Sequence, residues 1–479
     1  MGILKYLFLF GLVAAVALVW ARKQVDPSPY DYDEADYMFA ASRGFLANWS
    51  DTPSMSLPEF IQIGLSKGVN PAQSGDLSVL LRDSGDMDGY RHWHGTLYYY
   101  GLALAPAGWS ERTVRLLSFA ASLLGVAVVW AGCLWLWPSS TWGSQGVLAA
   151  TLSSLLLVWS PAVVKTTEIA PHILFSVVCL ATLFAAAKMR ETGRAKHWYA
   201  TLALAGVAFC TMELSFALIF AVLLFGHLER DRLFADSSGA PARFAGKSLA
   251  AFLAPVVLLW PVSLYKLNFI KSYLFMAYLA VFRKNPWGDV TFAQTWAYRF
   301  QHLPVELGLI ALAVVLFLRA KDSGARRSIS VFLIFGVIML AAVLRVNSTG
   351  SRYTLPFLAP LVVFTGVTLA SAMNRFAPPL RWTLAGLLAA AVFADTARQV
   401  NARPPEVNQK TVALLDAVRD PRWKGKTLLV PQGDIPTLHY YAQTVRFRGY
   451  YDASSIPARL RSEHFDGVAY PDEAVVRVP

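Results

Sequence analysis

Long uninterrupted blocks of apolar residues divide the chain, in place of the amphipathic stripes that are typical of helices in soluble proteins. Clear examples are residues 6–21, 116–137, 147–164 and 353–370. Uncharged runs of roughly 16–22 residues are long enough for a helix to cross about 30 Å of hydrocarbon. The pattern therefore predicts a polytopic α-helical membrane protein.

Extended to the whole chain, this pattern predicts about 11 membrane spans. They lie near residues 3–21, 113–136, 143–162, 169–187, 198–211, 213–227, 248–267, 303–319, 329–345, 353–373 and 381–396. The stretch 198–227 is divided because its two flanks, 188–196 and 230–247, are both basic and should lie on the same side. Residues 97–107 are too short to span and are predicted to form a half-inserted helix.

Composition supports a membrane protein, since 55% of the residues are hydrophobic and only 15% are charged, against about 25% charged in soluble domains. The net charge is +12, which by itself invites a nucleic-acid partner. The basic residues, however, gather in short clusters between apolar blocks, such as 190–196 and 319–327. This distribution is typical of cytoplasmic loops, so we expect no nucleic-acid binding, a cytoplasmic N-terminus and an extracytoplasmic C-terminal part.

Three regions differ in composition. Residues 1–396 hold the predicted transmembrane module, within which the first exterior loop, 22–95, carries 11 acidic and 6 basic residues. Two parts of that loop, 35–49 and 57–65, are predicted to be amphipathic helices on the membrane surface. Residues 268–302 form a second exterior loop that is rich in aromatic residues, which favour the lipid interface. Residues 397–479 predict a small α/β domain outside the membrane, with strands at 427–430, 445–450 and 467–470 and helices at 412–419 and 435–443.

The densest acidic cluster follows the first predicted span and contains Asp31, Asp33, Glu34 and Asp36. Ionisable groups at a membrane boundary are costly unless they are paired or solvated. One interpretation is structural, with Asp33 as the N-cap of a helix and Glu34 and Asp36 as solvated acids in its first turn. The other interpretation is catalytic, and the two are compatible because a capping carboxylate can also face a substrate.

A second group contains His92, His94 and Tyr98, with Asp83, Asp86 and Asp88 upstream. A divalent metal is possible here, although the acidic residues lack the full spacing of a calcium loop. The alternative is that the His and Tyr side chains only anchor the chain at the interface. No metal or other cofactor is assigned.

Cations also occur on the predicted exterior side, against the general bias. They are Lys165, Arg345 and Arg352, and they suggest an anionic exterior ligand such as a phosphate. An arginine at a span boundary is otherwise a snorkelling anchor. Glu168 and His172 lie four residues apart, so on a helix they would share a face.

Four segments, in order, resemble motifs of polyprenol-phosphate-dependent GT-C glycosyltransferases, which include the protein O-mannosyltransferase and lipid A aminoarabinose transferase families. Asp33-Glu34-Ala35-Asp36-Tyr37 resembles their Asp-Glu-x-x-Tyr start of the first exterior loop, and 94–99 resembles His/Lys-Pro-x-Leu-Tyr-Tyr. Residues 109–118 are similar to Gly-x-Ser-Glu-x-x-x-Arg-Leu-Pro-Ser, and 352–356 to Arg-Tyr-x-Leu-Pro. The resemblance covers about 1–375 and implies a GT-C-like fold.

The resemblance also implies roles for residues. Asp33 matches the general base that activates the acceptor, and the exterior cations would hold the phosphate of a lipid-linked donor. The substrate-binding residues expected in this way are Glu34, Tyr37, His94, Tyr98, Lys165, Glu168, His172, Arg352 and Tyr353. Two positions depart from the family. Gly95 replaces the usual proline, which is expected to loosen the turn, and His172 stands where an acidic residue is frequent, with Glu168 one turn earlier.

These features favour a membrane glycosyltransferase that moves one sugar from a polyprenyl-phosphate-linked donor to a lipid, glycan or protein acceptor. The reaction would take place at the extracytoplasmic face of a cell inner membrane, with the bilayer itself holding the lipid tail. Two alternatives stay open. A transporter or flippase of a lipid-linked precursor would use the same charged groups for binding only, with Glu213 as its one deep ionisable residue. A non-catalytic scaffold subunit would explain the departures at Gly95 and His172.

Overall fold

The computed structural model describes residues 2–42, 94–105, 108–137, 145–237, 240–261, 290–320, 323–344, 348–401, 405–450, 453–470 and 475–478, with Ser263, Tyr273 and Val346. The predicted helix at 57–65 and the acidic residues Asp83, Asp86 and Asp88 lie outside the described residues. So do His92, Arg345 and most of the aromatic loop 268–302.

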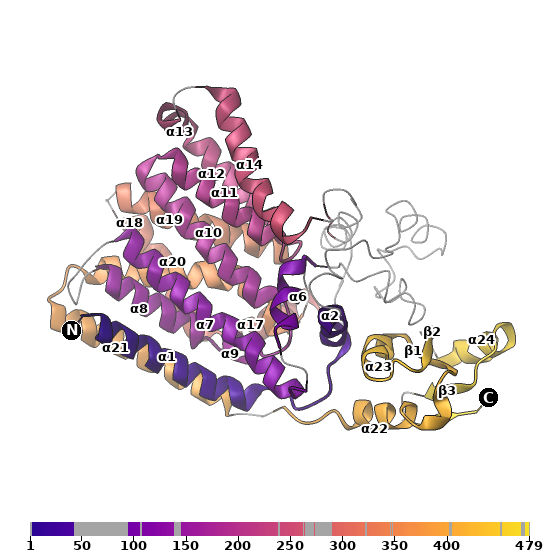
Figure 1. Cartoon of the computed structure of the whole chain (residues 1–479). Helices are drawn as coiled ribbons and strands as arrows, with labels where there is room; N and C mark the ends of the chain where they lie inside the picture. The colour runs from indigo at the N-terminus through magenta and orange to yellow at the C-terminus, as the bar shows by residue number, and fades with distance from the viewer. Residues whose placement is uncertain are drawn as a thin grey trace.

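Helices form the body of the molecule (Figure 1). In the first half of the chain they are α1 Gly2–Gln24, α2 Tyr32–Ser42, α6 Thr96–Ala103, α7 Glu111–Leu136, α8 Gln145–Val158, α9 Pro161–Lys165, α10 His172–Thr192, α11 Ala195–Phe209, α12 Ser215–Leu228, α13 Arg230–Asp236 and α14 Pro241–Leu259. In the second half they are α17 Phe292–His302, α18 Pro304–Arg319, α19 Ser323–Val343, α20 Leu355–Met373 and α21 Pro378–Val400, with a 3₁₀ turn, η2, at Ser351–Tyr353.

Among the described residues, six helices are long and apolar enough to cross a membrane, namely α7, α10, α14, α19, α20 and α21. The helices α17 and α18 meet at 89° and together make a seventh candidate. The molecule is therefore a polytopic helical membrane protein, while the number of about 11 spans stays a prediction. The predicted division of 198–227 into two helices is confirmed, because α11 ends at Phe209 and α12 begins at Ser215, while their crossing of the membrane stays a prediction.

The helices α8 and α20 lie at the centre of the bundle, since nearly all of their residues are buried. They approach closely where Ser153 faces Gly366, because a Cβ atom at Gly366 would lie 2.5 Å from the Ser153 backbone nitrogen. The Ser153 hydroxyl donates to the carbonyl of Val363 across the same contact (3.3 Å). Small residues permit such close packing in membranes, where apolar side chains alone give helices little reason to associate. The packing fixes the start of α20, which follows η2, the turn that contains Arg352.

Charged residues gather at the two ends of the bundle. At one end the buried Glu229 pairs with Arg190 (3.2 Å), Arg232 (2.9 Å) and Arg327 (3.7 Å). The basic stretches 190–196, 230–247 and 319–327 therefore share one side, as the sequence predicts. The helix α10 runs from this end, where it carries Arg190, to the other, where it begins at His172.

The C-terminal region contains a four-stranded sheet in the order β2-β1-β3-β4. The strands are β1 Thr427–Pro431, β2 Arg446–Tyr450, β3 Gly467–Tyr470 and β4 Val475–Arg477, and only β4 is antiparallel to its neighbour. The helices α22 Gln409–Val418, α23 Ile435–Tyr441 and α24 Ile456–Ser462 accompany it. The three predicted strands and two predicted helices are confirmed, and the short elements β4 and α24 were missed. That 397–479 is a separate domain outside the membrane stays a prediction.

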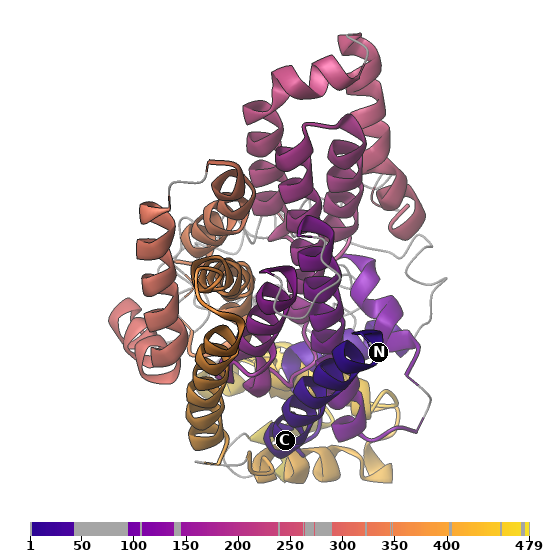
Figure 2. The same cartoon turned by 90° about the vertical axis from the view of Figure 1, so that its left-hand side faces the viewer.

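The C-terminal unit contacts the chain just after α1. Its helix α23 packs against α2. The Tyr441 hydroxyl donates to Glu111 Oε1 (2.8 Å) and accepts from the backbone N–H of Tyr30 (2.9 Å). In Figure 1 the sheet lies on the same side as α2, and α13 lies at the opposite end of the bundle. Figure 2 shows the same separation, with the yellow C-terminal region at the bottom and the pink helices at the top. The structure thus separates the molecule into a basic end and an end that carries α2 and the sheet.

This separation predicts the outcome of cysteine labelling in intact cells. A cysteine at Ser454 should react with a membrane-impermeant maleimide, whereas one at Asp231, whose side chain is 91% exposed, should react only after permeabilisation. The natural cysteines Cys133, Cys179 and Cys210 are buried and give a low background. Equal labelling of both positions from outside would contradict the predicted orientation.

Candidate functional site

The helix α2 begins at Tyr32, and Asp31 before it occupies the capping position. The Asp31 carbonyl accepts the first helical hydrogen bond, from the N–H of Ala35 (2.8 Å), and Glu34 Oε2 accepts from the Asp31 N–H (3.3 Å). The sequence-based assignment of Asp33 as the N-cap is therefore wrong, because Asp33 lies inside the first turn. Its carboxylate is not needed to cap the helix and is available for other contacts.

A buried ion pair between Glu34 and Arg115 holds the start of α2 on the bundle. Arg115, in the second turn of α7 and 2% exposed, also donates to the carbonyls of Asp26 (2.7 Å) and Ser28 (2.6 Å). Glu34 Oε1 accepts in addition from the backbone N–H of Ile169 (2.8 Å). Glu34, predicted to bind substrate, thus has both oxygens occupied by protein donors and joins three segments of the chain.

Arg352 brings Asp33 and Glu168 together. Its guanidinium lies 2.8 Å from Asp33 Oδ2 and 3.4 Å from Glu168 Oε2, and it donates to the Tyr353 hydroxyl at 3.1 Å. Both carboxylates keep 38% of their side-chain surface exposed, while Arg352 keeps 16%. Two predicted acids and one predicted cation therefore form one cluster, the Asp33 cluster, with a formal charge of about −1.

The electrostatics of this cluster follow from burial and pairing. Burial raises the pKa of Glu168, and Arg352 opposes the rise. Burial also disfavours a charged Arg352, but Glu168, Tyr353 and Asp33 outweigh it and hold the pKa of the guanidinium well above its usual range. Arg352 is therefore a permanent cation. Because water is largely excluded around it, its contacts are stronger than they would be on an open surface.

Glu168 and His172 reach the cluster differently from the prediction. The helix α10 begins at His172, so Glu168 lies in the preceding loop and the two residues do not share a helical face. Pro171 caps the helix and separates them. The His172 ring instead packs edge-on against Tyr353, with ring centroids 5.4 Å apart. Both residues thus lie beside the segment of Arg352 through separate contacts.

Tyr37 leads from the cluster to a second buried group. Its hydroxyl lies 2.9 Å from His94 Nε2, and His94 Nδ1 lies 2.8 Å from Glu213 Oε2 in the turn between α11 and α12. The Tyr98 hydroxyl lies 3.0 Å from Ser118 Oγ on α7, and its ring meets that of Tyr37 edge-on. Tyr37, His94 and Tyr98, predicted from two separate motifs, therefore lie together.

Gly95 does not loosen the turn, contrary to the expectation from the missing proline. Its N–H donates to the carbonyl of Thr211 (3.1 Å), a bond that proline cannot form. A Cβ atom at this position would lie 2.8 Å from the Cα atom of Cys210. Glycine is required because two backbone segments meet here, and this contact fixes His94 against the α11–α12 turn.

Asp36 is not the solvated acid that the sequence suggests. Its Oδ1 atom is buried, and none of the residues that the structure describes donates a hydrogen bond to it. Burial, and after it the neighbouring Asp33 carboxylate, raises the pKa of Asp36 to about 7. Asp36 therefore holds its proton to a higher pH than a solvated aspartate does.

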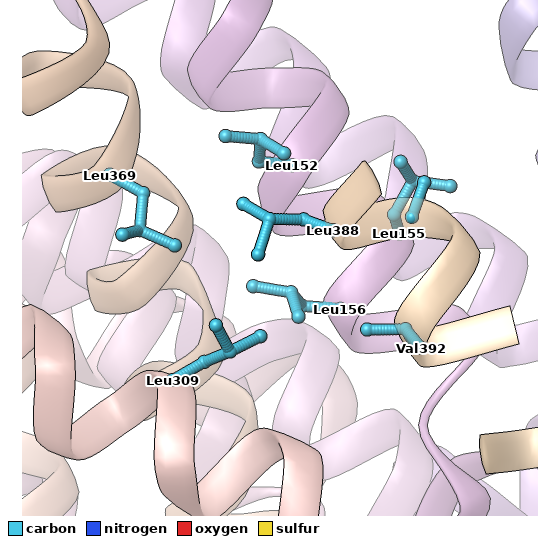
Figure 3. A pocket seen from close by; sticks show the side chains of 8 residues that line it. Leu152, Leu155, Leu156, Leu309, Leu369, Leu388 and Val392 are labelled. Atoms are coloured by element: carbon cyan, nitrogen blue, oxygen red, sulfur yellow. The ribbon is translucent and has the colours of Figure 1, made fainter. Parts of the chain in front are cut away.

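The remaining predicted groups lie apart or outside the described residues. Lys165 Nζ donates to Gln399 Oε1 on α21 (3.3 Å). Within the described ranges, no three His, Cys, Asp or Glu side chains gather so that they could hold a metal. Figure 3 shows a pocket between α8, α18, α20 and α21 that is lined by leucine, alanine and valine side chains. Since no charged side chain lines that pocket, it offers no groups for chemistry.

Three residues that the structure makes prominent were not among the predicted site residues, and one of them, Glu213, was considered only for the carrier alternative. Arg115 pairs with Glu34, and Glu213 pairs with His94. The sequence feature that could have indicated both residues is a charged side chain within or next to a predicted span. The third is Arg299 on α17, which is 3% exposed and packs over the rings of Trp296 and Phe357. No described residue accepts a hydrogen bond from its guanidinium nitrogens.

The fold is similar to those of known membrane proteins, although the sequence matches none of the proteins compared. No protein-family model matches the chain, and no curated protein matches its sequence. Its structure is similar to ArnT from Cupriavidus metallidurans bound to undecaprenyl phosphate, with a TM-score of 0.58 and 14% identity over 94% of this chain and 87% of that one. It is also similar to the oligosaccharyltransferase AglB of Archaeoglobus fulgidus in complex with an inhibitory peptide and a dolichol-phosphate, with a TM-score of 0.53 and 11% identity over 91% of this chain.

The chain spans 64% of the length of that archaeal protein, just under two thirds. At these identities the similarity establishes the fold, and the GT-C-like fold implied by the four motifs is confirmed. The lipid phosphates in those two structures are ligands of those proteins, and the shared fold does not by itself assign a ligand to this chain.

The buried pair predicts a large effect of Glu34→Gln on stability. Removing one charge strands Arg115 in a buried position, so the free energy of unfolding should fall by roughly 3–5 kcal/mol. Asp31→Asn is the matched control, because Asp31 is exposed and asparagine caps a helix equally well. Unfolding in mixed detergent micelles measures both variants. A Glu34→Gln protein within about 0.5 kcal/mol of wild type would show that the pair does not anchor α2.

Proposed function

We propose that this protein is a membrane glycosyltransferase that moves one sugar from a polyprenyl-phosphate-linked donor to an acceptor hydroxyl at the extracytoplasmic face. The observation that carries the proposal is the contact between Arg352 and Asp33 (2.8 Å) at the end of the bundle. The contact orients the partly exposed Asp33 carboxylate and places it beside the permanently charged Arg352 guanidinium. A base and an anion-stabilising group side by side are what such a transfer needs.

The fold adds to this argument. The two similar structures contain undecaprenyl phosphate and dolichol-phosphate, respectively. A lipid-linked donor of this class suits the present chain because the Asp33 cluster lies where the apolar helices end, so that a lipid tail can stay in the bilayer while its phosphate reaches the cluster. We place the face that carries the cluster outside an inner membrane, on the strength of the basic clusters at the other end.

In the proposed reaction, Asp33 accepts the proton of the acceptor hydroxyl as the acceptor oxygen attacks the anomeric carbon of the sugar. The bond between that carbon and the phosphate oxygen breaks, and its electron pair leaves with the lipid phosphate. Arg352 keeps Asp33 in position and, with more N–H donors than its protein contacts use, also stabilises the departing anion. Arg299, a buried cation beside Phe357, is a second group suited to the phosphate.

The other predicted residues receive positioning or binding roles. Glu34 holds α2 through Arg115, while Glu168 and Tyr353 orient Arg352 from its other side. His172 packs on Tyr353, and Lys165 stabilises the end of α21 through Gln399. Glu213, the residue on which a carrier function would depend, is bonded to His94 in the turn between α11 and α12. No observation on the described residues therefore favours a transporter over an enzyme.

Asp33→Asn tests the proposal. Asparagine cannot accept a proton as a carboxylate does, so turnover should fall by ~10²–10⁴, or about 3–5 kcal/mol of barrier, with folding preserved. Purified protein in nanodiscs, incubated with undecaprenyl-phosphoryl mannose, glucose or aminoarabinose and a membrane acceptor extract, releases undecaprenyl phosphate that can be measured.

Asp31→Asn is the control here too, because it removes a carboxylate two residues away that does not contact Arg352 in the described structure. It should keep near wild-type turnover. An Asp33→Asn protein as active as this control would remove Asp33 as the base.

A further inference from the structure

A chain of three buried side chains leads away from the Asp33 cluster. It runs from the Tyr37 hydroxyl to His94 Nε2 (2.9 Å) and from His94 Nδ1 to Glu213 Oε2 (2.8 Å). Tyr37 is 4% exposed and His94 is 8% exposed, and the Glu213 side chain is 10% exposed. The residues come from α2, from the segment before α6 and from the α11–α12 turn, so their meeting is a product of the tertiary fold.

The backbone fixes this geometry. The N–H groups of Gly95 and Leu97 donate to the carbonyls of Thr211 (3.1 Å) and Cys210 (3.0 Å). These two bonds hold the residues on either side of the α6 start against the α11–α12 turn, which carries Glu213. His94 therefore cannot move away from Glu213 without breaking backbone pairing, and its Nδ1–H has one defined acceptor.

Tyr37 lies between this chain and the reaction site. It follows Asp33 by four residues on α2, so the two side chains share a face of the helix. Burial, followed by the Asp33 carboxylate, raises the pKa of Tyr37 well above its usual range, so its hydroxyl keeps its proton. It has one proton to donate, and the partner of that proton is decided by His94.

We propose that Glu213 and His94 act as a switch that sets the direction of the Tyr37 hydroxyl, which points its proton at the reaction site when His94 is protonated and at His94 when it is neutral. The inference rests on the proposed function and deepens it. In the imidazolium form both ring nitrogens donate, one to Glu213 and one to the Tyr37 oxygen, so the Tyr37 proton is free to stabilise the departing lipid phosphate. In the neutral form Nε2 accepts that proton.

The charges around His94 favour the protonated form. Burial disfavours it, but Glu213 outweighs burial and raises the pKa of the ring above its ordinary value. Asp33 on α2 adds to the rise, and Arg352 on η2 opposes it. Of the other ionisable groups nearby, Asp36 on α2 and His172 at the start of α10 interact with the charge of His94, and Tyr99 on α6 lies against the His94 backbone. Since the active form is the protonated one, activity is present below the pKa of His94 and lost as pH rises through it.

The first measurement does not depend on turnover. In protein labelled with ¹⁵N-histidine in nanodiscs, the His94 ring signals, identified by their loss in His94→Gln, should show both nitrogens protonated up to a higher pH than in an exposed histidine. Glu213→Gln keeps the shape and the acceptor but removes the charge, so the titration of His94 should move to lower pH by about one unit or more. An unchanged His94 titration in this variant overturns the switch.

The second measurement is the pH profile of turnover with the donors used for Asp33. In wild type, kcat should fall on the alkaline side, by roughly 10²-fold as one donor to the departing anion is lost. Glu213→Gln should move that fall to lower pH with the donor KM little changed, and should regain activity at low pH. Tyr37→Phe should remove the alkaline fall and stay at the low level at all pH values.

Glu111→Gln is the matched control, since Glu111 lies at the same end of the bundle and bonds Tyr441 instead of His94. It should leave the profile in place. A purely structural Glu213 would lower activity equally at every pH, and that result overturns the proposal. If wild type transfers none of the sugars, the proposed function fails, and the histidine titration still decides the switch.

Discussion

The buried pair between Arg115 and Glu34 is the interaction on which the site depends. Ionised groups lose much of their hydration energy inside a helical bundle, and they stay charged there only when each finds a partner and further hydrogen bonds. Arg115 meets this condition with Glu34 and the backbone carbonyls around Ser28, and Glu34 with the N–H of Ile169. Breaking any part leaves an unpaired buried charge, so the start of α2 has one stable position.

That position has consequences for every residue further along α2. Asp33 immediately precedes Glu34, and Asp36 and Tyr37 follow it within one turn of helix. Asp33 meets Arg352, whose own place is fixed by the packing of α20 against α8. Tyr37 meets His94, which is fixed by the backbone contact of Gly95 with the α11–α12 turn. The ion pair of Glu34, the packing of α20 and the backbone contact of Gly95 therefore all act on α2. Together they place the Asp33 carboxylate beside the Arg352 guanidinium, where the apolar helices end.

The sequence predicted the parts of this molecule that the bilayer dictates. Lipid demands long apolar helices, so the helical body, the two helices within 198–227 and the gathering of basic stretches on one side could be predicted. The motifs also selected Asp33, Arg352, Tyr37 and His94, which the fold brings into contact or near contact. The C-terminal strands could be predicted because their short apolar runs alternate with turns.

The contacts between residues far apart in the chain could not be predicted from the sequence. Glu34 and Arg115 are 81 residues apart, His94 and Glu213 are 119 apart, and Asp33 and Arg352 are 319 apart, and no local pattern records such contacts. The errors have the same origin. Asp33 was taken for a cap because capping preferences do not separate it from Asp31, and Asp36 was taken as solvated because burial is set by segments distant in the sequence. Gly95 was expected to loosen the turn because the sequence around it does not show that the backbone of Cys210 packs against it.

The most direct test of the account is an experimental structure of the protein in nanodiscs with undecaprenyl phosphate bound. The account predicts density for the phosphate within hydrogen-bonding distance of the Arg352 guanidinium, on the side that faces Asp33, with the lipid tail running down the bundle into the bilayer. Phosphate density only between the central helices, near the leucine-lined pocket and away from Arg352, would contradict it.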